Sequence, residues 1–438
     1  MTDILNDMTR EGIPFAEETV TDDTKDRLRQ MIRERDNADD AAGNVVAVED
    51  IDAEDLFRKL QKAVLMQADE TLLTDHAYVG DVCGVGCAET GKYYLLAKAE
   101  DNPANHPKLG RIVTAEEYRT LMDNTFMTLD GCTIFGAYVE GEWVFHMMDE
   151  VRTGITMVTF GLVNQLFSRN TGLFESDSMM TKTAVIVGQG SAGSVVALYL
   201  ARSGVGRFIL VDADTMELHN ICRHQLDSRD LGRYKVDAMR DAILRINPKA
   251  EVQVFRGWLE KAPMELFSDV KDGIVVATAD DMVPNALANE LAKVMGVPFV
   301  AFAGWTRCHA GEIFYWMPGK GLPTYGQAFR DLIAEAEATP KADHSNYFAD
   351  AHDAETLNFE TGTGVDLGFI SMAALKFILD LLNLGNDHYT TRVLDDYTNY
   401  TLICNTNKPE IGGENAAMFP KPMYISDNIT LSAEGDCA

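Results

Sequence analysis

A glycine-rich run near the middle of the chain has the residue types of a phosphate-binding loop. Gly188–Gly193 reads Gly-Gln-Gly-Ser-Ala-Gly, follows a short apolar segment and precedes a second one that ends at Asp212. Glycines let the backbone turn tightly and bring its N–H groups, at the start of a helix, close to an anion. An acidic residue after the second segment is placed to accept hydrogen bonds from ribose hydroxyls. The pattern predicts a nucleotide site whose loop is shaped by Gly188, Gly190 and Gly193.

Further polar and charged residues follow Asp212 along the chain. They are Asp214, Asn220, Arg223 and Lys235. A dinucleotide does not require the two cations, because its pyrophosphate binds to backbone amides. A nucleoside triphosphate does require them, because fixed cations must neutralise the β and γ phosphates and the departing pyrophosphate. We therefore predict that the site binds ATP in preference to NAD. The alternative is that Arg223 and Lys235 are surface charges on a helix.

Acidic residues also follow a later apolar segment. Residues 273–277 have the composition of a buried parallel strand, and Asp280 and Asp281 come shortly after it. Ligand-binding residues of a doubly wound sheet lie at the carboxyl ends of its strands. We therefore expect Asp280 at the nucleotide site. The alternative is that Asp280 caps the next helix.

This ordered set resembles the ubiquitin-activating family in its compact prokaryotic form, typified by the ThiF and MoeB proteins. The resemblance extends over residues 165–320 and, more loosely, over the C-terminal part. It implies that Asp280 holds Mg²⁺ near the phosphates. Asp281 stands where the family usually has Asn, and Asn285 where it often has Arg, so Asp280 and Asp281 remain alternative metal ligands. The resemblance also implies that Arg169 reaches across a dimer interface to the neighbouring subunit's triphosphate, unless Arg169 caps its own helix.

The resemblance implies a homodimeric, Mg-ATP-dependent adenylyltransferase. Its substrate would be the C-terminal carboxylate of a small ubiquitin-like (β-grasp) protein, and pyrophosphate would be released. No general base is required, because a carboxylate is already ionised at neutral pH. A conjugating enzyme or a sulfur donor could then receive the activated carboxylate. The alternatives are adenylation of a ribosomal peptide or a tRNA base, or a nucleotide-binding scaffold without catalysis.

The elements that must position these residues form a doubly wound, Rossmann-like α/β domain, expected over residues 153–438. It should begin with an apolar helix within residues 153–180 and contain a core helix over residues 364–382. The strands that the apolar runs predict are residues 184–187, 208–211, 251–255, 273–277, 297–302 and 312–316, with antiparallel additions at 400–404 and 422–425.

A smaller α/β domain is expected before it, over residues 45–152. Its pattern predicts a helix over residues 53–66, and strands over 92–97, 132–139 and 143–148. Residues 1–44 are polar and acidic, and we expect a flexible segment with a short helix over residues 21–35. In the family such accessory domains commonly recognise a substrate or partner.

The polar segment over residues 322–360 corresponds to the family's crossover loop. The cysteines that bind zinc in many members are missing at its start, so we expect no zinc site. The segment contains no cysteine at all, whereas thioester-forming relatives place one there. Cys308 and Cys404 are the remaining candidates for a thioester, and we predict that neither forms one.

The charge balance limits the partners of the whole chain. It has 68 acidic and 38 basic residues and a formal charge of −30. Such a surface repels phosphate backbones and anionic lipid, so we expect no general nucleic-acid binding and no membrane association. The sequence shows no signal-peptide pattern and no apolar run long enough to span a bilayer. Its seven cysteines, an odd number, suit a reducing compartment. A cytoplasmic location is therefore expected.

Overall fold

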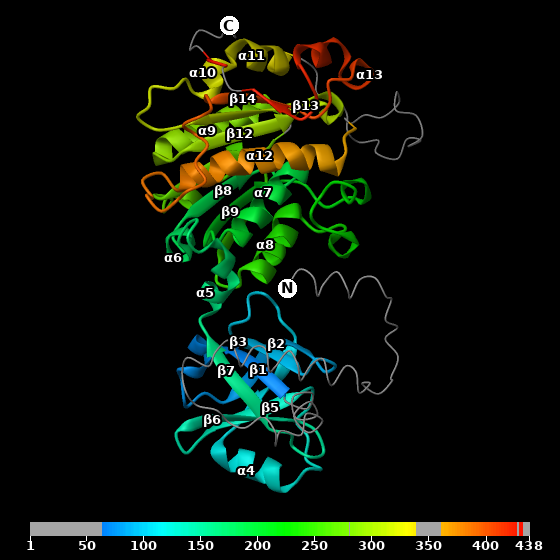
Figure 1. Ribbon diagram of the computed structural model, residues 1–438, viewed down its shortest axis with the longest axis vertical. Helices are drawn as coiled ribbons and strands as arrows, with labels where there is room; N and C mark the ends of the chain where they lie inside the picture. The colour runs from blue at the N-terminus through cyan, green and yellow to red at the C-terminus, as the bar shows by residue number, and fades with distance from the viewer. Residues whose placement is uncertain (1–63, 280, 339–360, 427–428, 432–438) are drawn as a thin grey trace, which may run out of the picture. The chain divides into compact units, whose positions relative to one another are not determined.

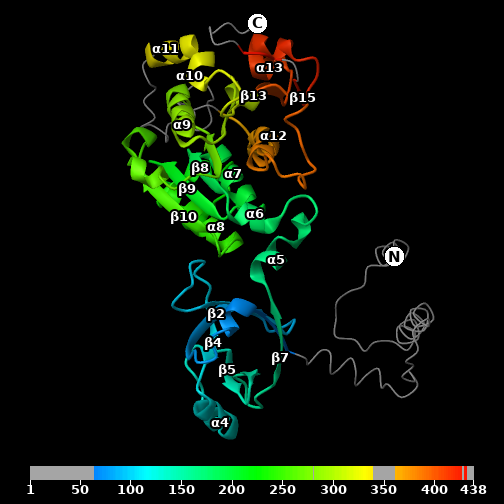
Figure 2. The same ribbon diagram turned by 90° about the vertical axis from the view of Figure 1, so that its left-hand side faces the viewer.

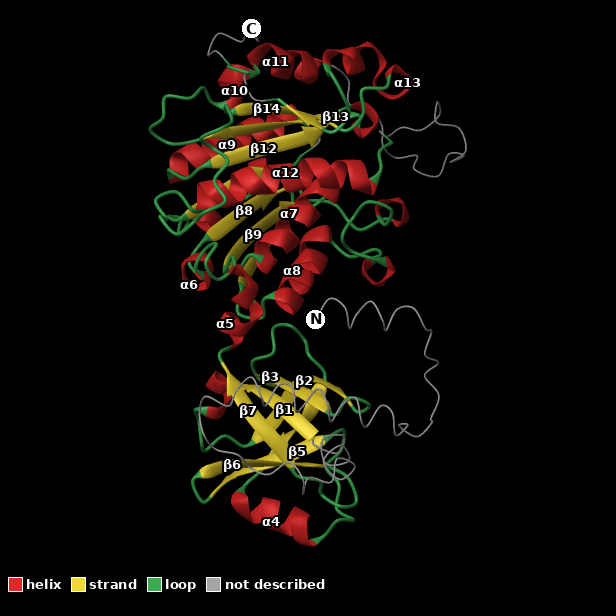
Figure 3. Ribbon diagram, in the orientation of Figure 1, coloured by secondary structure: helices red, strands yellow, loops and turns green. Residues whose placement is uncertain are grey.

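The computed structural model (Figures 1 and 2) describes residues 64–279, 281–338, 361–426 and 429–431. These residues form a seven-stranded sheet in the first part and an eight-stranded sheet in the second part. Figure 3 shows that the first part of the chain consists mainly of strands, whereas helices cover the second sheet. The helix expected over residues 21–35 lies outside the described residues, as does most of the one expected over residues 53–66.

The first sheet has the strand order β6-β5-β4-β2-β3-β1-β7. Its α-helix, α4 (Ala115–Asp123), is capped by Thr114, whose side chain accepts a hydrogen bond from the N–H of Glu117. The strands expected over 92–97, 132–139 and 143–148 are confirmed as β3, β5 and β6. The strands are β1 (Val64–Asp69), β2 (Gly80–Cys87), β3 (Lys92–Lys98), β4 (Lys108–Ile112), β5 (Ile134–Val139), β6 (Glu142–Met147) and β7 (Ile155–Phe160).

The structure contradicts the end of one helix prediction near this sheet and the start of another. The end of the helix expected over residues 53–66 lies in strand β1, which pairs in parallel with both β3 and β7. The apolar helix expected within residues 153–180 is replaced at its start by β7. Strand β7 is rich in β-branched residues, and its six residues pair with β1. Pairing with partners far along the chain outweighed the local pattern at both positions. The first sheet therefore continues past residue 152, where the boundary was expected.

Short helices connect β7 to the second sheet. They are α5 (Leu162–Leu166), the 3₁₀ turn η3 (Ser168–Asn170) and α6 (Ser176–Met180). Phe167 and Met179 are buried in this segment. These apolar side chains contribute to the helical pattern that the sequence shows here. In the structure the helical residues are divided among three separate short helices.

The second sheet has the strand order β10-β9-β8-β11-β12-β13-β14-β15. The strands from β10 to β12 are parallel, and β13, β14 and β15 are antiparallel additions. The expected doubly wound domain and its antiparallel extension are thus confirmed. The strands are β8 (Thr183–Val187), β9 (Arg207–Asp212), β10 (Glu251–Arg256), β11 (Gly273–Ala277), β12 (Phe299–Gly304), β13 (Ala310–Trp316), β14 (Tyr400–Cys404) and β15 (Tyr424–Ile425).

Alternating side chains of these strands build a separate core on each face of the sheet. Ala184 and Ile186 of β8 pack with residues of α7 (Ser191–Arg202), α8 (Lys235–Ile246) and α12 (Gly364–Leu382). Val185 and Val187 pack on the opposite face with residues of α9 (Met282–Met295). Figures 1 and 2 show these helices on the two faces. The core helix expected over residues 364–382 is confirmed.

Part of the expected crossover loop is helical. Residues 325–338 form α10 (Tyr325–Ala328) and α11 (Arg330–Ala338), and residues 339–360 lie outside the described part. Tyr325 and Phe329 are buried and pack their rings against Phe314. These aromatic contacts tie the start of the segment to the sheet, a feature that its polar composition concealed. No helix within the described ranges has the length and apolar character to cross a membrane.

Candidate functional site

The glycine loop connects β8 to α7 at the carboxyl edge of the second sheet. Gly188 has a φ of +90°, a conformation that residues with a side chain rarely adopt. A Cβ on Gly193 would lie 2.0 Å from the carbonyl oxygen of Gly188, so only glycine allows this close approach. A Cβ on Gly190 would meet no atom within 4 Å. The loop therefore turns tightly on Gly188 and Gly193 and leaves open space beside Gly190.

The N-terminus of α7 faces this space without a side-chain cap. Gly190 is the N-cap residue and makes no side-chain hydrogen bond, and the first turn contains no acidic residue. The first N–H groups of a helix have no partner within the helix and carry a partial positive charge. This end of α7 is thus suited to an anion such as phosphate.

Asp212 connects the end of β9 to the glycine loop. Its carboxylate accepts hydrogen bonds from the backbone N–H of Gln189 and, at 2.7 Å, from that of Asp214. Burial raises the pKa of Asp212, while the charge of Lys235 and these two hydrogen bonds act in the opposite direction. The carboxylate therefore fixes the position of the loop relative to the end of β9.

Lys235 is the first residue of α8 and is only 7% exposed. Its Nζ lies 3.0 Å from a carboxylate oxygen of Asp214, and its N–H donates to the Asp214 carbonyl oxygen. Asp214 itself is exposed. The fold thus brings Asp212, Asp214, Lys235 and the glycine loop together, as the sequence analysis expected.

His224 is part of this site, although the sequence analysis did not select it. It is 7% exposed. Its Nδ1 accepts the N–H of Leu226 at 3.0 Å, so Nε2 carries the proton and donates to the Gln189 carbonyl oxygen at 2.7 Å. Burial lowers the pKa of His224 to about 4. The imidazole is therefore neutral at pH 7 and holds the glycine loop through the Gln189 carbonyl oxygen, whereas Asp212 holds it through the Gln189 N–H. His224 directly follows Arg223, which the sequence analysis selected, and this position is the signal that could have indicated His224 as a site residue.

Asn220 and Arg223 lie in the loop that precedes His224. The Asn220 side-chain oxygen accepts the N–H of Glu217 at 2.9 Å, which stabilises the short turn η4 (Leu218–Asn220). Arg223 is half-buried. A Cβ on Gly364 would come within 3.3 Å of the Arg223 Cα, so the first turn of α12 packs directly on this loop.

The beginning of α9 shows which of the two neighbouring aspartates caps that helix. Asp281 is the N-cap residue, and its carboxylate accepts the N–H of Val283 at 3.1 Å. Asp280 lies outside the described residues. Among the residues that are described, no group of three or more His, Cys, Asp or Glu side chains could hold a metal ion.

Within one chain, Arg169 lies away from the other residues of the candidate site. It is exposed in η3, and its neighbour Asn170 donates to the carbonyl oxygen of Arg202, the last residue of α7. The glycine loop lies at the other end of that helix, roughly 16 Å away for a helix of this length. Arg169 could act at a nucleotide site only if a second chain brought the two together.

Cys308 and Cys404 are both buried. The sulfur of Cys308 is packed against two glycines, because a Cβ would come within 3.2 Å of it at Gly304 and within 2.5 Å at Gly362. Cys404 lies in β14, where burial raises the pKa of its thiol. A reactive thiolate needs a lowered pKa and access, so their surroundings do not favour either residue as a nucleophile.

Comparison with known proteins decides which family has this site. The model of the ThiF family matches residues 164–409, more than half of the chain. The chain belongs to the ThiF family. The matched range contains the second sheet from β8 to β14 and all of the site residues described above.

Curated proteins are also similar to parts of this chain. An adenylyltransferase and sulfurtransferase uba4 of Emericella nidulans is 30% identical over 211 residues, 47% of this chain and 40% of that protein. A ubiquitin-like modifier-activating enzyme 5 of Caenorhabditis elegans is 27% identical over 220 residues, 47% of this chain and 50% of that protein. A molybdopterin-synthase adenylyltransferase of Escherichia coli is 32% identical over 162 residues, 37% of this chain and 64% of that protein. The chain thus matches at most about two thirds of the length of these relatives.

Proposed function

We propose that this chain binds Mg-ATP at the carboxyl edge of its second sheet and adenylates a carboxylate. The observation that carries the proposal is the convergence of the glycine loop, Asp212 and the buried Lys235 at the uncapped N-terminus of α7. Backbone amides and a fixed cation are the groups that hold a polyphosphate. Membership of the ThiF family supports the same reaction class.

The reaction joins two anions. A carboxylate oxygen attacks the α-phosphorus of ATP, the bond to the β-phosphate oxygen breaks, and pyrophosphate leaves. Arg223 and Lys235 would screen the negative charge as the anions meet, and Asp212 and Asp214 would lie beside the nucleoside. Mg²⁺, when bound, would neutralise phosphate charge and orient the leaving group. Asp280 is the ligand that we propose for it, since the Asp281 carboxylate is already engaged in capping α9.

We further infer that the carboxylate is the C-terminus of a small ubiquitin-like protein. The relatives named as a ubiquitin-like modifier-activating enzyme and as a molybdopterin-synthase adenylyltransferase favour a protein substrate. Pyrophosphate exchange into ATP that depends on an added β-grasp protein would support this substrate. Mg-ATP binding without exchange for any carboxylate substrate would favour the scaffold alternative instead.

Nucleotide binding can be tested without knowing the substrate. By calorimetry we expect Mg-ATP to bind and NAD to bind more weakly or not at all. Lys235→Ala should weaken ATP binding by roughly 10²-fold, the usual effect of removing a charge that clamps phosphate. Lys261→Ala removes an exposed lysine from another element and serves as the control. Tighter binding of NAD than of Mg-ATP would overturn the assignment of the site.

The product should leave as an adenylate without a covalent enzyme intermediate. Cys308 and Cys404 are too buried to approach an acyl carbon to within roughly 3–3.5 Å, the distance that attack requires. A non-reducing gel after incubation with substrate and Mg-ATP should therefore show no thiol-sensitive adduct. An adduct that disappears with Cys308→Ala or Cys404→Ala would contradict this expectation.

A further inference from the structure

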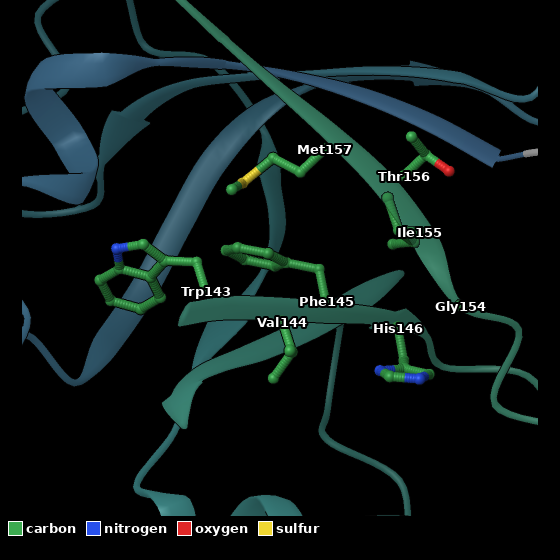
Figure 4. A pocket seen from close by; sticks show the side chains of 8 residues that line it. All are labelled: Trp143, Val144, Phe145, His146, Gly154, Ile155, Thr156 and Met157. Atoms are coloured by element: carbon green, nitrogen blue, oxygen red, sulfur yellow. The ribbon is translucent and has the colours of Figure 1, made fainter. Parts of the chain in front are cut away.

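The two outer strands of the first sheet, β6 and β7, approach each other only where their connecting turn joins them. His146 and Gly154 form an isolated antiparallel bridge, and the N–H of Met147 donates to the Thr153 carbonyl oxygen at 2.9 Å. Figure 4 shows that β7 then runs away from β6 at an angle. A cleft of about 490 Å³ lies between the diverging strands. The sheet therefore curls toward a barrel without closing.

Apolar side chains form the floor of this cleft. Trp143 and Phe145 of β6 and Ile155 and Met157 of β7 line it, as Figure 4 shows. All four also pack on the core of the first sheet. The Trp143 Nε1 donates to the Leu73 carbonyl oxygen at 2.9 Å, which holds the indole in place. The floor is thus preformed, and a ligand would not have to order it.

The backbone edges on both sides of the cleft are open beyond the bridge. Among the described strands, β7 pairs only with β1, and β6 only with β5. Proteins usually protect such edges with a charge, a proline or a bulge. Strand β7 reads Ile-Thr-Met-Val-Thr-Phe and has no charged residue and no proline. An extended chain placed in the cleft could donate and accept backbone hydrogen bonds on both of its sides.

Exposed carboxylates lie close in sequence to the residues that line the cleft. Glu140 is exposed at the turn before β6, Glu142 is exposed at the first position of β6, and Glu150 is exposed at the turn before β7. Arg152 is the one arginine or lysine in the sequence between residues 139 and 168. It is only 4% exposed, and its guanidinium donates to the carbonyl oxygens of Leu121, Asn124, Thr125, Met127 and Asp149. No cation of this segment is left to compensate the carboxylates.

We propose that the cleft between β6 and β7 binds an extended, basic polypeptide segment by strand addition. The open edges supply main-chain pairing, the apolar floor accepts alternate side chains of the added strand, and the carboxylates select for lysine or arginine at its ends. The site lies in the part of the chain that precedes the ThiF match, and the proposal does not depend on the adenylation reaction.

A short synthetic peptide can probe the cleft in the full-length protein. Fluorescein-labelled Lys-Val-Thr-Val-Thr-Val-Lys should bind, as measured by anisotropy, and should slow amide hydrogen exchange in residues 142–147 and 155–160. The double variant Glu142→Lys/Glu150→Lys should weaken this binding about tenfold at low salt, with a smaller effect at high salt. Glu260→Lys/Glu265→Lys makes the same change of charge at exposed sites of the second sheet's domain and should leave binding unchanged.

The peptide itself provides the controls that do not depend on the folding of a variant. Methylation of all the backbone nitrogens between the end residues of the peptide removes the donors on both of its edges, so the methylated peptide should not bind. The acidic peptide Glu-Val-Thr-Val-Thr-Val-Glu should bind much more weakly than the basic one. Absence of binding by the basic peptide at about 1 mM, equal binding by either control peptide, or protection outside β6 and β7 would overturn the proposal.

Discussion

At the scale of single residues, protonation of His224 should affect the stability of the fold, because its neutral imidazole hydrogen-bonds to the glycine loop. Its pKa of about 4 in the folded protein lies below the value of 6.5 for an unperturbed histidine. The unfolded chain therefore takes up the proton first as the pH falls, and folding stability decreases between about pH 6.5 and pH 4. The histidine should contribute a loss of about 2 kcal/mol in the free energy of unfolding between pH 7 and pH 5. Lys235 and Asp230 also face this imidazole, with opposite effects on its pKa.

Urea unfolding at the two pH values, for the wild type and for His224→Gln, measures this contribution. Glutamine can replace the hydrogen bond from Nε2 to the Gln189 carbonyl oxygen but does not titrate, so the variant should bind ATP and lose less stability on acidification. His224→Ala should lose both hydrogen bonds and weaken ATP binding at either pH. The same pH dependence in the wild type and His224→Gln would show that another group causes it.

At the scale of secondary-structure elements, the close approach of β8 and α7 depends on glycine at one position and tolerates a side chain at another. Gly193→Ala should destabilise the fold by about 2–4 kcal/mol, because its Cβ would overlap the Gly188 carbonyl oxygen. Gly190→Ala should cost only about 0.5–1 kcal/mol, the usual loss when alanine replaces glycine at an N-cap, because open space surrounds that position.

Chemical denaturation measures these stabilities, and calorimetry then separates stability from binding. Gly190→Ala should fold normally and still bind ATP more weakly, because its methyl group would occupy the space beside the N-terminus of α7. Unchanged ATP affinity in Gly190→Ala would place the phosphates elsewhere.

At the scale of the whole molecule, the position of Arg169 makes a prediction about assembly. Arg169 and Lys235 would meet at one site only if they came from different subunits. In a homodimer, Arg169→Ala and Lys235→Ala should each weaken nucleotide binding at both sites. Mixed dimers of the two variants should regain one intact site, which titration with a fluorescent ATP analogue would detect.

This complementation experiment distinguishes a dimer whose subunits share their nucleotide sites from a monomer and from a dimer in which Arg169 has only a structural role. A mixture that binds no better than its components, or a protein that light scattering finds monomeric while it binds ATP, would restrict Arg169 to a structural role. Co-expression of the two variants with different affinity tags allows the mixed dimer to be isolated and measured alone.

The sequence by itself determined the strands of the second sheet, its core helix α12 and most of the residues gathered at its edge. Runs such as Gly273–Ala277 are apolar throughout and end in recognisable turn residues, so local pattern and final structure agree there. Gly296, in the left-handed conformation at the end of α9, is an example of such a turn residue. The proposed roles of Asp280 and Arg169 remain predictions.

Only the tertiary structure decided the features that depend on contacts between distant segments. Strands β1 and β7 are stabilised by pairing with each other across about 90 residues of sequence, which no local period encodes. The hydrogen bond from His224 to Gln189 and the packing of α12 on the Arg223 loop likewise join residues that are far apart in the chain. A hydrogen bond or packing contact of this kind requires the two segments to be brought together first, so its partners can be identified only in the folded molecule.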